Sequence, residues 1–271
     1  MSFDALETSL ASGQPLRLYH FARGVDSWRY SSGDRDITHN TLVYESVPGG
    51  IADDGIRQTG QTSPDKLTLT VPADLEVAQL YRAAPPSTAV TLTVFALHWT
   101  EADYIVIWSG NVRSVRWPQP DRASIVCAPL SEAMDATGLR LTWDRSCPHA
   151  LYSAACGVSA ALWRVEATVQ SVDGASVESG AFAGYPDGWF TAGYLEWFVG
   201  SVTERRGIER HVGSTLWLLG GASGIPVGAT ARAYRGCPQT TAACISFDNL
   251  PNYGGIPHLA GVSPFDGRNP Y

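Results

Sequence analysis

The chain has 271 residues, of which 44% are hydrophobic and 17% charged, a composition that supports one or two folded domains and excludes a disordered chain. Its 19 basic and 26 acidic residues give a net charge of −7, which disfavours a protein that coats nucleic acid. No stretch reaches the roughly 18 apolar residues of a membrane span, and the first residues lack the basic and apolar regions of a signal peptide. We therefore expect a soluble protein made in a cytosol, with no sequence-specific nucleic acid among its partners.

Short strands dominate the elements predicted for the first half of the chain. An N-terminal helix is predicted where Phe3, Leu6 and Leu10 share a face, and a second helix follows Asp74 and ends at Pro85. The continuous apolar run 104–108 indicates a strand buried on both faces. The other predicted strands, two of them with strict alternation, are 15–21, 41–44, 66–71, 88–94, 112–117 and 123–128.

The second half of the chain shows further strand candidates separated by turn signals such as Asp173-Gly174. The glycine-rich segment 220–224 lacks the spacing of a phosphate-binding loop and is predicted to be a hairpin turn. The tail from Phe247 onward shows neither helix nor strand periodicity. The predicted strands are 161–172, 188–198, 203–210, 214–219 and 229–235. The fold class is therefore predicted as mainly β, with two tube-like β-barrel or sandwich domains, residues 1–140 and 141–271, and few short helices.

Searches for catalytic motifs return nothing that predicts an enzyme. The chain contains no nucleophile elbow, no H-E-x-x-H zinc motif and no P-loop, and Lys66 is its only lysine. The adjacent carboxylates Asp53 and Asp54 are expected in a turn or loop. His149 and His258 lie beside cysteine-rich segments and are expected to be surface or capping residues rather than ligands.

Four of the five cysteines form two pairs, and these are the strongest candidates for a functional site. Cys147 and Cys156 enclose eight residues, Cys237 and Cys244 enclose six, and a proline follows the first cysteine of each pair. Proline fixes φ and turns the chain, which suits a loop that directs a thiolate inward. Cys127, within an apolar run, is predicted to be a buried core residue.

Three interpretations of the paired cysteines remain open on spacing alone. A structural zinc site is tetrahedral and usually has loops of two to four residues, shorter than both spacers. An iron–sulfur cluster also takes four thiolates, and its larger size suits ligands on long, separate loops. Two disulfides are the third possibility, and the absence of a signal peptide disfavours them. Either metal would clip the start and end of the second domain together, which is a structural role.

The residues around these cysteines resemble a family of phage tail proteins. The chain is similar to the baseplate hub, or tail-tip, proteins of long-tailed, non-contractile phages and gene transfer agents, including lambda-type tail-tip proteins, whose cysteine pairs have the same spacers. The N-terminal half resembles this family more weakly, through its length, its short first helix and the Gly55-Ile56 turn. The segments that carry the resemblance are Arg145–Tyr152, Cys156–Val158, Gly188–Tyr194, Gly236–Cys244, Phe247–Asn249 and Asn252–Pro257.

The resemblance implies that Cys147, Cys156, Cys237 and Cys244 ligate a structural [4Fe–4S] cluster, with zinc as the alternative metal. It also implies a homotrimeric ring in the virion, assembled in the host cytoplasm, at the distal end of the tail. The partners it implies are the ring of distal tail protein, a central fibre or receptor-binding protein and the tape measure protein. A mildly acidic lumen would keep passing DNA from sticking. The alternatives are a metal-dependent, tail-associated enzyme such as a cell-wall hydrolase, and a zinc-type binding module.

Overall fold

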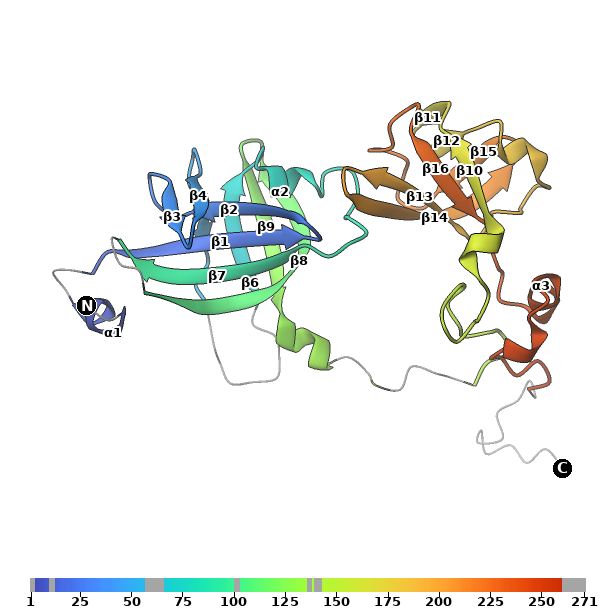
Figure 1. Ribbon diagram of the computed structural model, residues 1–271, viewed down its shortest axis with the longest axis horizontal. Coiled ribbons are helices and arrows are strands. Elements are labelled where there is room, and N and C mark those ends of the chain that lie inside the picture. Colours follow the sequence, from blue (N-terminus) through green and yellow to red (C-terminus); the bar gives the residue numbers. More distant parts are fainter. Residues whose placement is uncertain are drawn as a thin grey trace. The chain divides into compact units, whose positions relative to one another are not determined.

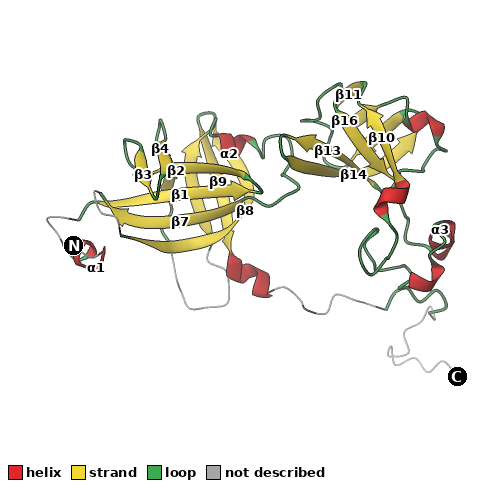
Figure 2. Cartoon of the chain, viewed as in Figure 1, coloured by secondary structure: helices red, strands yellow, loops and turns green. Residues whose placement is uncertain are grey.

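The computed structural model describes residues 3–9, 13–56, 66–99, 103–135, 138 and 143–259. It divides into unit 1, Met1–Ala136 with Val199–Glu204, and unit 2, Thr137–Phe198 with Arg205–Tyr271. Both are built on β-sheets with few short helices (Figures 1 and 2), which confirms the mainly β prediction. No helix among these residues is long and apolar enough to cross a bilayer. The predicted boundary at 140–141, the predicted helix residue Leu10 and the tail beyond residue 259 lie outside the described residues.

Unit 1 contains a nine-stranded sheet in the order β3-β4-β2-β1-β7-β8-β9-β6-β5. All paired neighbours are antiparallel except β2 and β4, which run parallel. Its short helices are α1 Phe3–Glu7, α2 Glu76–Gln79 and the 3-10 helix η1 Leu130–Asp135. The strands are β1 Pro15–Arg23, β2 Asp26–Ser31, β3 Ile37–His39, β4 Leu42–Ser46, β5 Ala52–Asp53, β6 Leu67–Pro72, β7 Thr91–His98, β8 Tyr104–Gln119 and β9 Arg122–Pro129.

The alternation predicted for residues 66–71 builds part of the unit 1 core. Leu67, Leu69 and Val71 on β6 are fully buried on one face, because successive side chains of a strand point to opposite faces. Opposite Leu67 on β9 lies Cys127, which is also fully buried. The prediction that Cys127 is a core cysteine is therefore confirmed, and burial raises the pKa of its thiol.

The apolar run 104–108 is not buried on both faces as predicted. Tyr104, Ile105 and Val106 are 40%, 43% and 57% exposed. The run is the first part of β8, a single strand that also contains the predicted strand 112–117 and has two register shifts against β9 and one against β7. Hydrophobicity alone does not separate an apolar residue in the core from one left at the surface.

The second predicted helix is shorter than its amphipathic pattern suggests. α2 is a single turn, and it buries Val77 and Ala78. Leu80 and Tyr81 continue its apolar face and pack against the core from the turn that follows. The helical pattern therefore located the buried face correctly and overestimated the length of the helix.

Asp53 links β5 to β1 through a carboxylate that is almost completely buried. Tyr19 donates a hydrogen bond to it at 2.7 Å, the Gly55 amide donates a second at 3.0 Å, and Arg17 forms an ion pair with it. Burial alone would raise the pKa of Asp53, but the hydrogen bonds and the Arg17 charge outweigh this effect and lower it.

We expect unit 1 to lose stability as the pH falls, partly because of Asp53. A carboxyl group whose folded pKa lies below its unfolded pKa stabilises the fold above the unfolded value and ceases to do so as pH falls through the folded value. Asp53→Asn should cost about 1–3 kcal/mol at neutral pH. The variant should also lose less unfolding free energy than the unmodified chain between about pH 5 and pH 2, as measured by urea unfolding. An equal loss of unfolding free energy in the variant and the unmodified chain over this pH range would contradict the role given to Asp53.

Unit 2 contains a seven-stranded arrangement in the order β10-β16-β13-β14-β15-β12-β11. Its buried core includes Trp197, Phe182, Phe190 and Leu195, each at most 2% exposed. Its helices are α3 Thr241–Ser246 and the 3-10 helices η2 Ala160–Trp163, η3 Phe182–Gly184 and η4 Leu250–Asn252. The strands are β10 Arg164–Thr168, β11 Ser171–Asp173, β12 Ser176–Glu178, β13 Tyr194–Val199, β14 Val202–Val212, β15 Thr215–Leu218 and β16 Thr230–Tyr234.

Two long strands predicted for the second half are broken up in the structure. The predicted strand 161–172 begins as η2, continues as β10 and restarts as β11. The first half of the predicted strand 188–198 forms turns, and β13 begins only at Tyr194. The segment 220–224 forms bends and turns with Gly220, Gly221 and Gly224 at positive φ, as predicted for a glycine turn. It is not the predicted hairpin, because it joins β15 to β16, which are not neighbours in the sheet.

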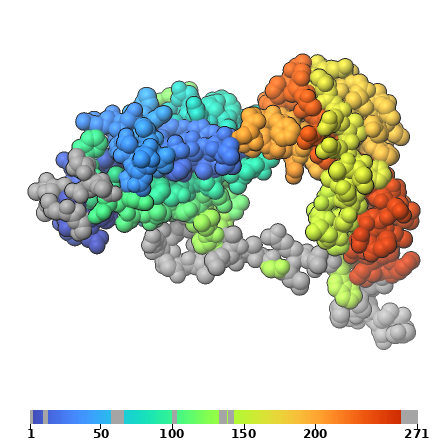
Figure 3. Space-filling view, in the orientation of Figure 1, coloured from blue at the N-terminus to red at the C-terminus, as the bar shows by residue number. Residues whose placement is uncertain are grey.

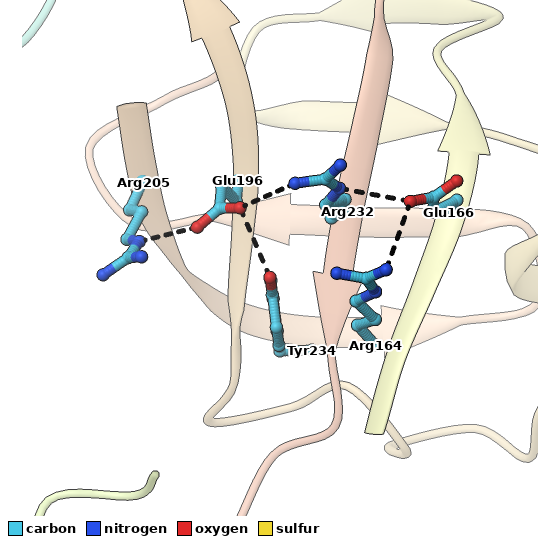
Figure 4. Close-up of polar contacts among 6 residues, drawn as sticks. All are labelled: Arg164, Glu166, Glu196, Arg205, Arg232 and Tyr234. Atoms are coloured by element: carbon cyan, nitrogen blue, oxygen red, sulfur yellow. Dashed lines mark hydrogen bonds and ion pairs between the residues drawn. The ribbon is translucent and has the colours of Figure 1, made fainter. Parts of the chain in front are cut away.

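One face of the unit 2 sheet carries a row of alternating charges, drawn in Figure 4. Arg232 on β16 lies opposite both Glu166 on β10 and Glu196 on β13, and Arg205 on β14 donates to Glu196 at 2.8 Å. The Glu196 side chain is only 5% exposed and also accepts a hydrogen bond from the Tyr234 hydroxyl. Exposed pairs contribute little to stability, so the buried member of this row is Glu196, whose loss would leave the hydroxyl of the buried Tyr234 without this partner.

Candidate metal centre

All four paired cysteines line one small cavity in unit 2. The segments that carry them, residues 147–158 and 237–253, lie side by side, yellow-green against red in Figures 1 and 3. Cys127 is not among the lining residues and belongs to the core of unit 1. His149, two positions after Cys147, lines the cavity and His258 does not.

The first cysteine pair is held in an irregular loop by backbone contacts. The Cys147 amide donates to the Gln239 carbonyl at 2.9 Å, which joins the first segment directly to the second. The Cys156 amide lies 3.3 Å from the Ser153 hydroxyl oxygen, which accepts its hydrogen bond. Gly157, at φ +73°, then turns the chain out of the loop, a conformation that favours glycine.

The second cysteine pair lies on two different local structures. Cys237 follows the end of β16, and the Gln239 amide donates to its sulfur at 3.4 Å. Cys244 lies in α3, which begins after Thr240, whose hydroxyl accepts from the Ala243 amide at 3.2 Å. The spacer of six residues thus contains a turn and the first part of a capped helix, and it directs both sulfurs into one cavity.

Asn249 connects the two pairs and was part of the segment Phe247–Asn249 that carried the sequence resemblance. Its side-chain amide donates to the Cys156 carbonyl at 2.6 Å, and its backbone amide donates to the Cys244 carbonyl at 3.0 Å. Sequence alone gave this residue no role, because an asparagine five positions after a cysteine has no distinctive spacing. Tyr253 acts similarly, donating its hydroxyl proton to the Arg145 carbonyl at 2.6 Å.

The chain beyond Asn252 packs tightly against the first cysteine segment. The Ile256 amide donates to the Asp144 carbonyl at 2.8 Å. A Cβ atom on Gly255 would lie 2.6 Å from the carbonyl oxygens of Arg145 and Ser146, so only glycine fits there. The tail that lacked periodicity in the sequence therefore lines the cavity as far as Tyr253 and continues against the first cysteine segment.

The electrostatics of the cavity favour neutral thiols at Cys237 and Cys244. Burial raises the pKa of Cys237 and of Cys244, and the neighbouring cysteines raise both further. Thiolates that repel one another in a partly buried site are stabilised by a metal, which takes the place of the protons.

Arg235 holds the cysteine segments against the sheet of unit 2. Its guanidinium carbon lies 4.5, 4.1 and 4.1 Å from the ring centroids of Trp163, Trp189 and Phe247. The same side chain donates to the Ser246 carbonyl at 3.0 Å and to the Ser246 hydroxyl at 2.6 Å. Its backbone carbonyl accepts the Tyr152 hydroxyl proton at 2.7 Å. One residue therefore connects both cysteine segments to β16.

We expect Arg235→Met to destabilise unit 2 by about 2–3 kcal/mol, because it removes a partly desolvated cation from three aromatic rings together with two hydrogen bonds. Arg235→Lys should recover only part of the stability lost in Arg235→Met, since an ammonium group cannot stack on the rings as a planar guanidinium does. Urea unfolding followed by tryptophan fluorescence measures the change. Arg164→Met on the neighbouring β10 is the matched control and should cost less than about 0.5 kcal/mol. Equal losses in the two methionine variants would contradict the role given to Arg235.

The residues present fit a metal by their chemistry, and their spacing bears on which metal. All five cysteines carry free thiols, so the structure contains neither of the two disulfides that the sequence left open. Within the described part of the chain, no three His, Cys, Asp or Glu side chains are grouped closely enough to hold an ion. The four sulfurs line one cavity, as the thiolate ligands of one metal centre would.

Two β units, with a thiol-lined cavity built from loops of the second, define a mainly β protein as the class. The family model for the baseplate hub protein, N-terminal attachment domain, matches residues 17–159, more than half of the chain. The chain belongs to this baseplate hub family and is a structural protein of the phage-type virion baseplate. The model for phage conserved hypothetical protein BR0599 matches residues 188–262. The first cysteine pair lies within the former match and the second within the latter.

Two further similarities extend over most of the chain. A chain from the virion of a native gene transfer agent particle has the same fold, with a TM-score of 0.75 and 20% identity, over 96% of this chain and 93% of that one. An uncharacterized protein of Xylella fastidiosa (strain 9a5c) is 28% identical over 188 residues, which are 64% of this chain. The match covers 38% of the Xylella protein, so this chain corresponds to a minor part of that longer protein.

Proposed function

We propose that the chain is the hub at the distal end of a long, non-contractile tail, where three copies form a ring. In this arrangement the ring joins the distal tail protein to a central fibre or receptor-binding protein, and the tape measure protein and DNA pass through it. Membership of the baseplate hub family carries the proposal, and the fold likeness to a gene transfer agent virion chain supports it. The net charge of −7 is compatible with a lumen that does not retain DNA.

We further propose that Cys147, Cys156, Cys237 and Cys244 hold a structural [4Fe–4S] cluster. The observation that carries this proposal is that four free thiols, brought from two segments about 80 residues apart, line a single cavity. The cluster is larger than one ion, which suits ligands on long and separate loops. When bound, it would supply four iron–thiolate bonds that cross-link the start and end of unit 2. The residues of the chain contribute the loop geometry, the Asn249 bridge and the Arg235 anchor.

Metal analysis of the full chain tests the cofactor. Protein purified without oxygen from an iron-replete host should be brown, with broad absorption near about 400 nm, about four irons per chain and little zinc. Stoichiometric zinc without iron would assign the same four thiols to a zinc site. Protein containing neither metal, yet folded and stable, would overturn the proposal that the cavity is a metal centre.

A further inference from the structure

One edge of β2, in unit 1, is left partly unpaired. β1 and β2 are joined by a two-residue turn, and in such a hairpin every second residue directs its backbone N–H and C=O groups away from the partner strand. On β2 these residues are Ser27, Arg29 and Ser31. On that outer edge β4 pairs in parallel with only Tyr30 and Ser31. Within the described part of the chain, therefore, no strand lies beside residues 26–28.

A cavity of about 400 Å³ lies along this free edge. Its walls are residues 27–30 of β2, residues 43–48 of β4 and the following turn, and residues 72–76 between β6 and α2. We call this cavity the β2 groove. Trp28 donates its indole proton to the Glu76 carboxylate at 2.8 Å, which links β2 to the start of α2 beside the groove. An open strand edge next to a groove with an aromatic wall is the geometry by which sheets bind extended peptides.

The charges of the β2 groove indicate what such a peptide carries. Glu45, Asp74 and Glu76 line it and are exposed, against a single basic side chain, Arg29. One Arg29 terminal nitrogen donates to the Ser27 hydroxyl at 2.6 Å, whereas its Nε is buried and has no hydrogen-bond partner among the described residues. Three exposed carboxylates against one arginine leave the groove acidic, which favours a basic segment.

We propose that the β2 groove binds an extended, basic segment of a partner protein, which adds to the sheet as a strand beside residues 26–29. The backbone of the segment pairs with Ser27 and Arg29, and its basic side chains face Glu45 and Asp74. The groove lies within the region matched by the attachment domain of the family. The inference concerns unit 1 alone and does not depend on the metal proposed for unit 2.

Selection from a library of random peptides of about ten residues, displayed and panned on the full chain, tests this inference. Enriched peptides should contain basic residues within an alternating, strand-like pattern. Their affinity, measured by fluorescence anisotropy, should fall by about tenfold or more on the double variant Glu45→Lys/Asp74→Lys. The matched control Asp173→Lys/Glu209→Lys reverses two exposed carboxylates in unit 2 and should bind as the unmodified chain does.

A second measurement uses the unmodified chain and so does not depend on how a variant folds. Two versions of the best peptide are made, one N-methylated at its odd-numbered amides and one at its even-numbered amides. One version should lose binding and the other should keep it, because an added strand pairs through every second residue. Equal binding of both versions would overturn the proposal, as would equal affinity for the two double variants or the absence of any enriched peptide. A dimer of the chain that dissociates in Glu45→Lys/Asp74→Lys would overturn it in favour of a second copy in the groove.

Discussion

Replacing any one of Cys147, Cys156, Cys237 or Cys244 by serine is expected to remove the iron and the absorption near about 400 nm from the purified chain. Each sulfur lines the same cavity, so each loss leaves three ligands on loops that have little secondary structure of their own. Metal binding energy contributes directly to folding where the site does not persist without metal, so unit 2 should also unfold at lower denaturant concentration.

Cys127→Ala is the matched control for these four variants. Cys127 is fully buried in the unit 1 core and contacts none of the cavity, so its replacement should cost about 1 kcal/mol and leave the iron content unchanged. Iron content and urea unfolding of all five variants provide the comparison. Iron lost from Cys127→Ala, or retained in Cys244→Ser, would show that the ligand set is wrong.

Particles whose hub carries Cys147→Ser are expected to lose nearly all infectivity. Without the metal, the segments 147–158 and 237–253 are held only by a few hydrogen bonds and by the Arg235 anchor, so little unit 2 remains in the folded form that assembles. The expected defect is missing or shortened tails, because the ring cannot form at the distal end. Electron microscopy of the particles, together with their titre, measures it.

The Cys127→Ala particle is again the control and should have normal tails and titre. Normal tails built from the Cys147→Ser protein would contradict the structural role of the site. An isolated chain that degraded peptidoglycan would favour the tail-associated enzyme instead. The mass of the purified complex, assembled with its tail partners where necessary, tests the trimer separately.

The alternation of apolar and polar residues predicted strands from the sequence alone. The run 66–71 became β6 with one face buried, and the isolated apolar Cys127 was recognised as a core residue. The apolar pattern gave wrong predictions where burial depended on residues distant in the sequence, because local hydrophobicity does not show which segments pack against a strand. Ile105 and Val106 are apolar yet exposed, and the predicted strand 188–198 spends its first half in turns.

The sequence alone identified the candidate site, because residue type and the spacing within each cysteine pair are local properties. The site residues are Cys147, Cys156, Cys237 and Cys244. Only the tertiary structure showed that the four thiols share a cavity, and that Arg235 lies among rings from residues 163, 189 and 247. The same holds for the free edge of β2, whose neighbours are determined by strand pairing between segments far apart in the chain. Periodicity and motif spacing act over a few residues, whereas register, burial and the approach of distant loops are set by the packing of the whole unit.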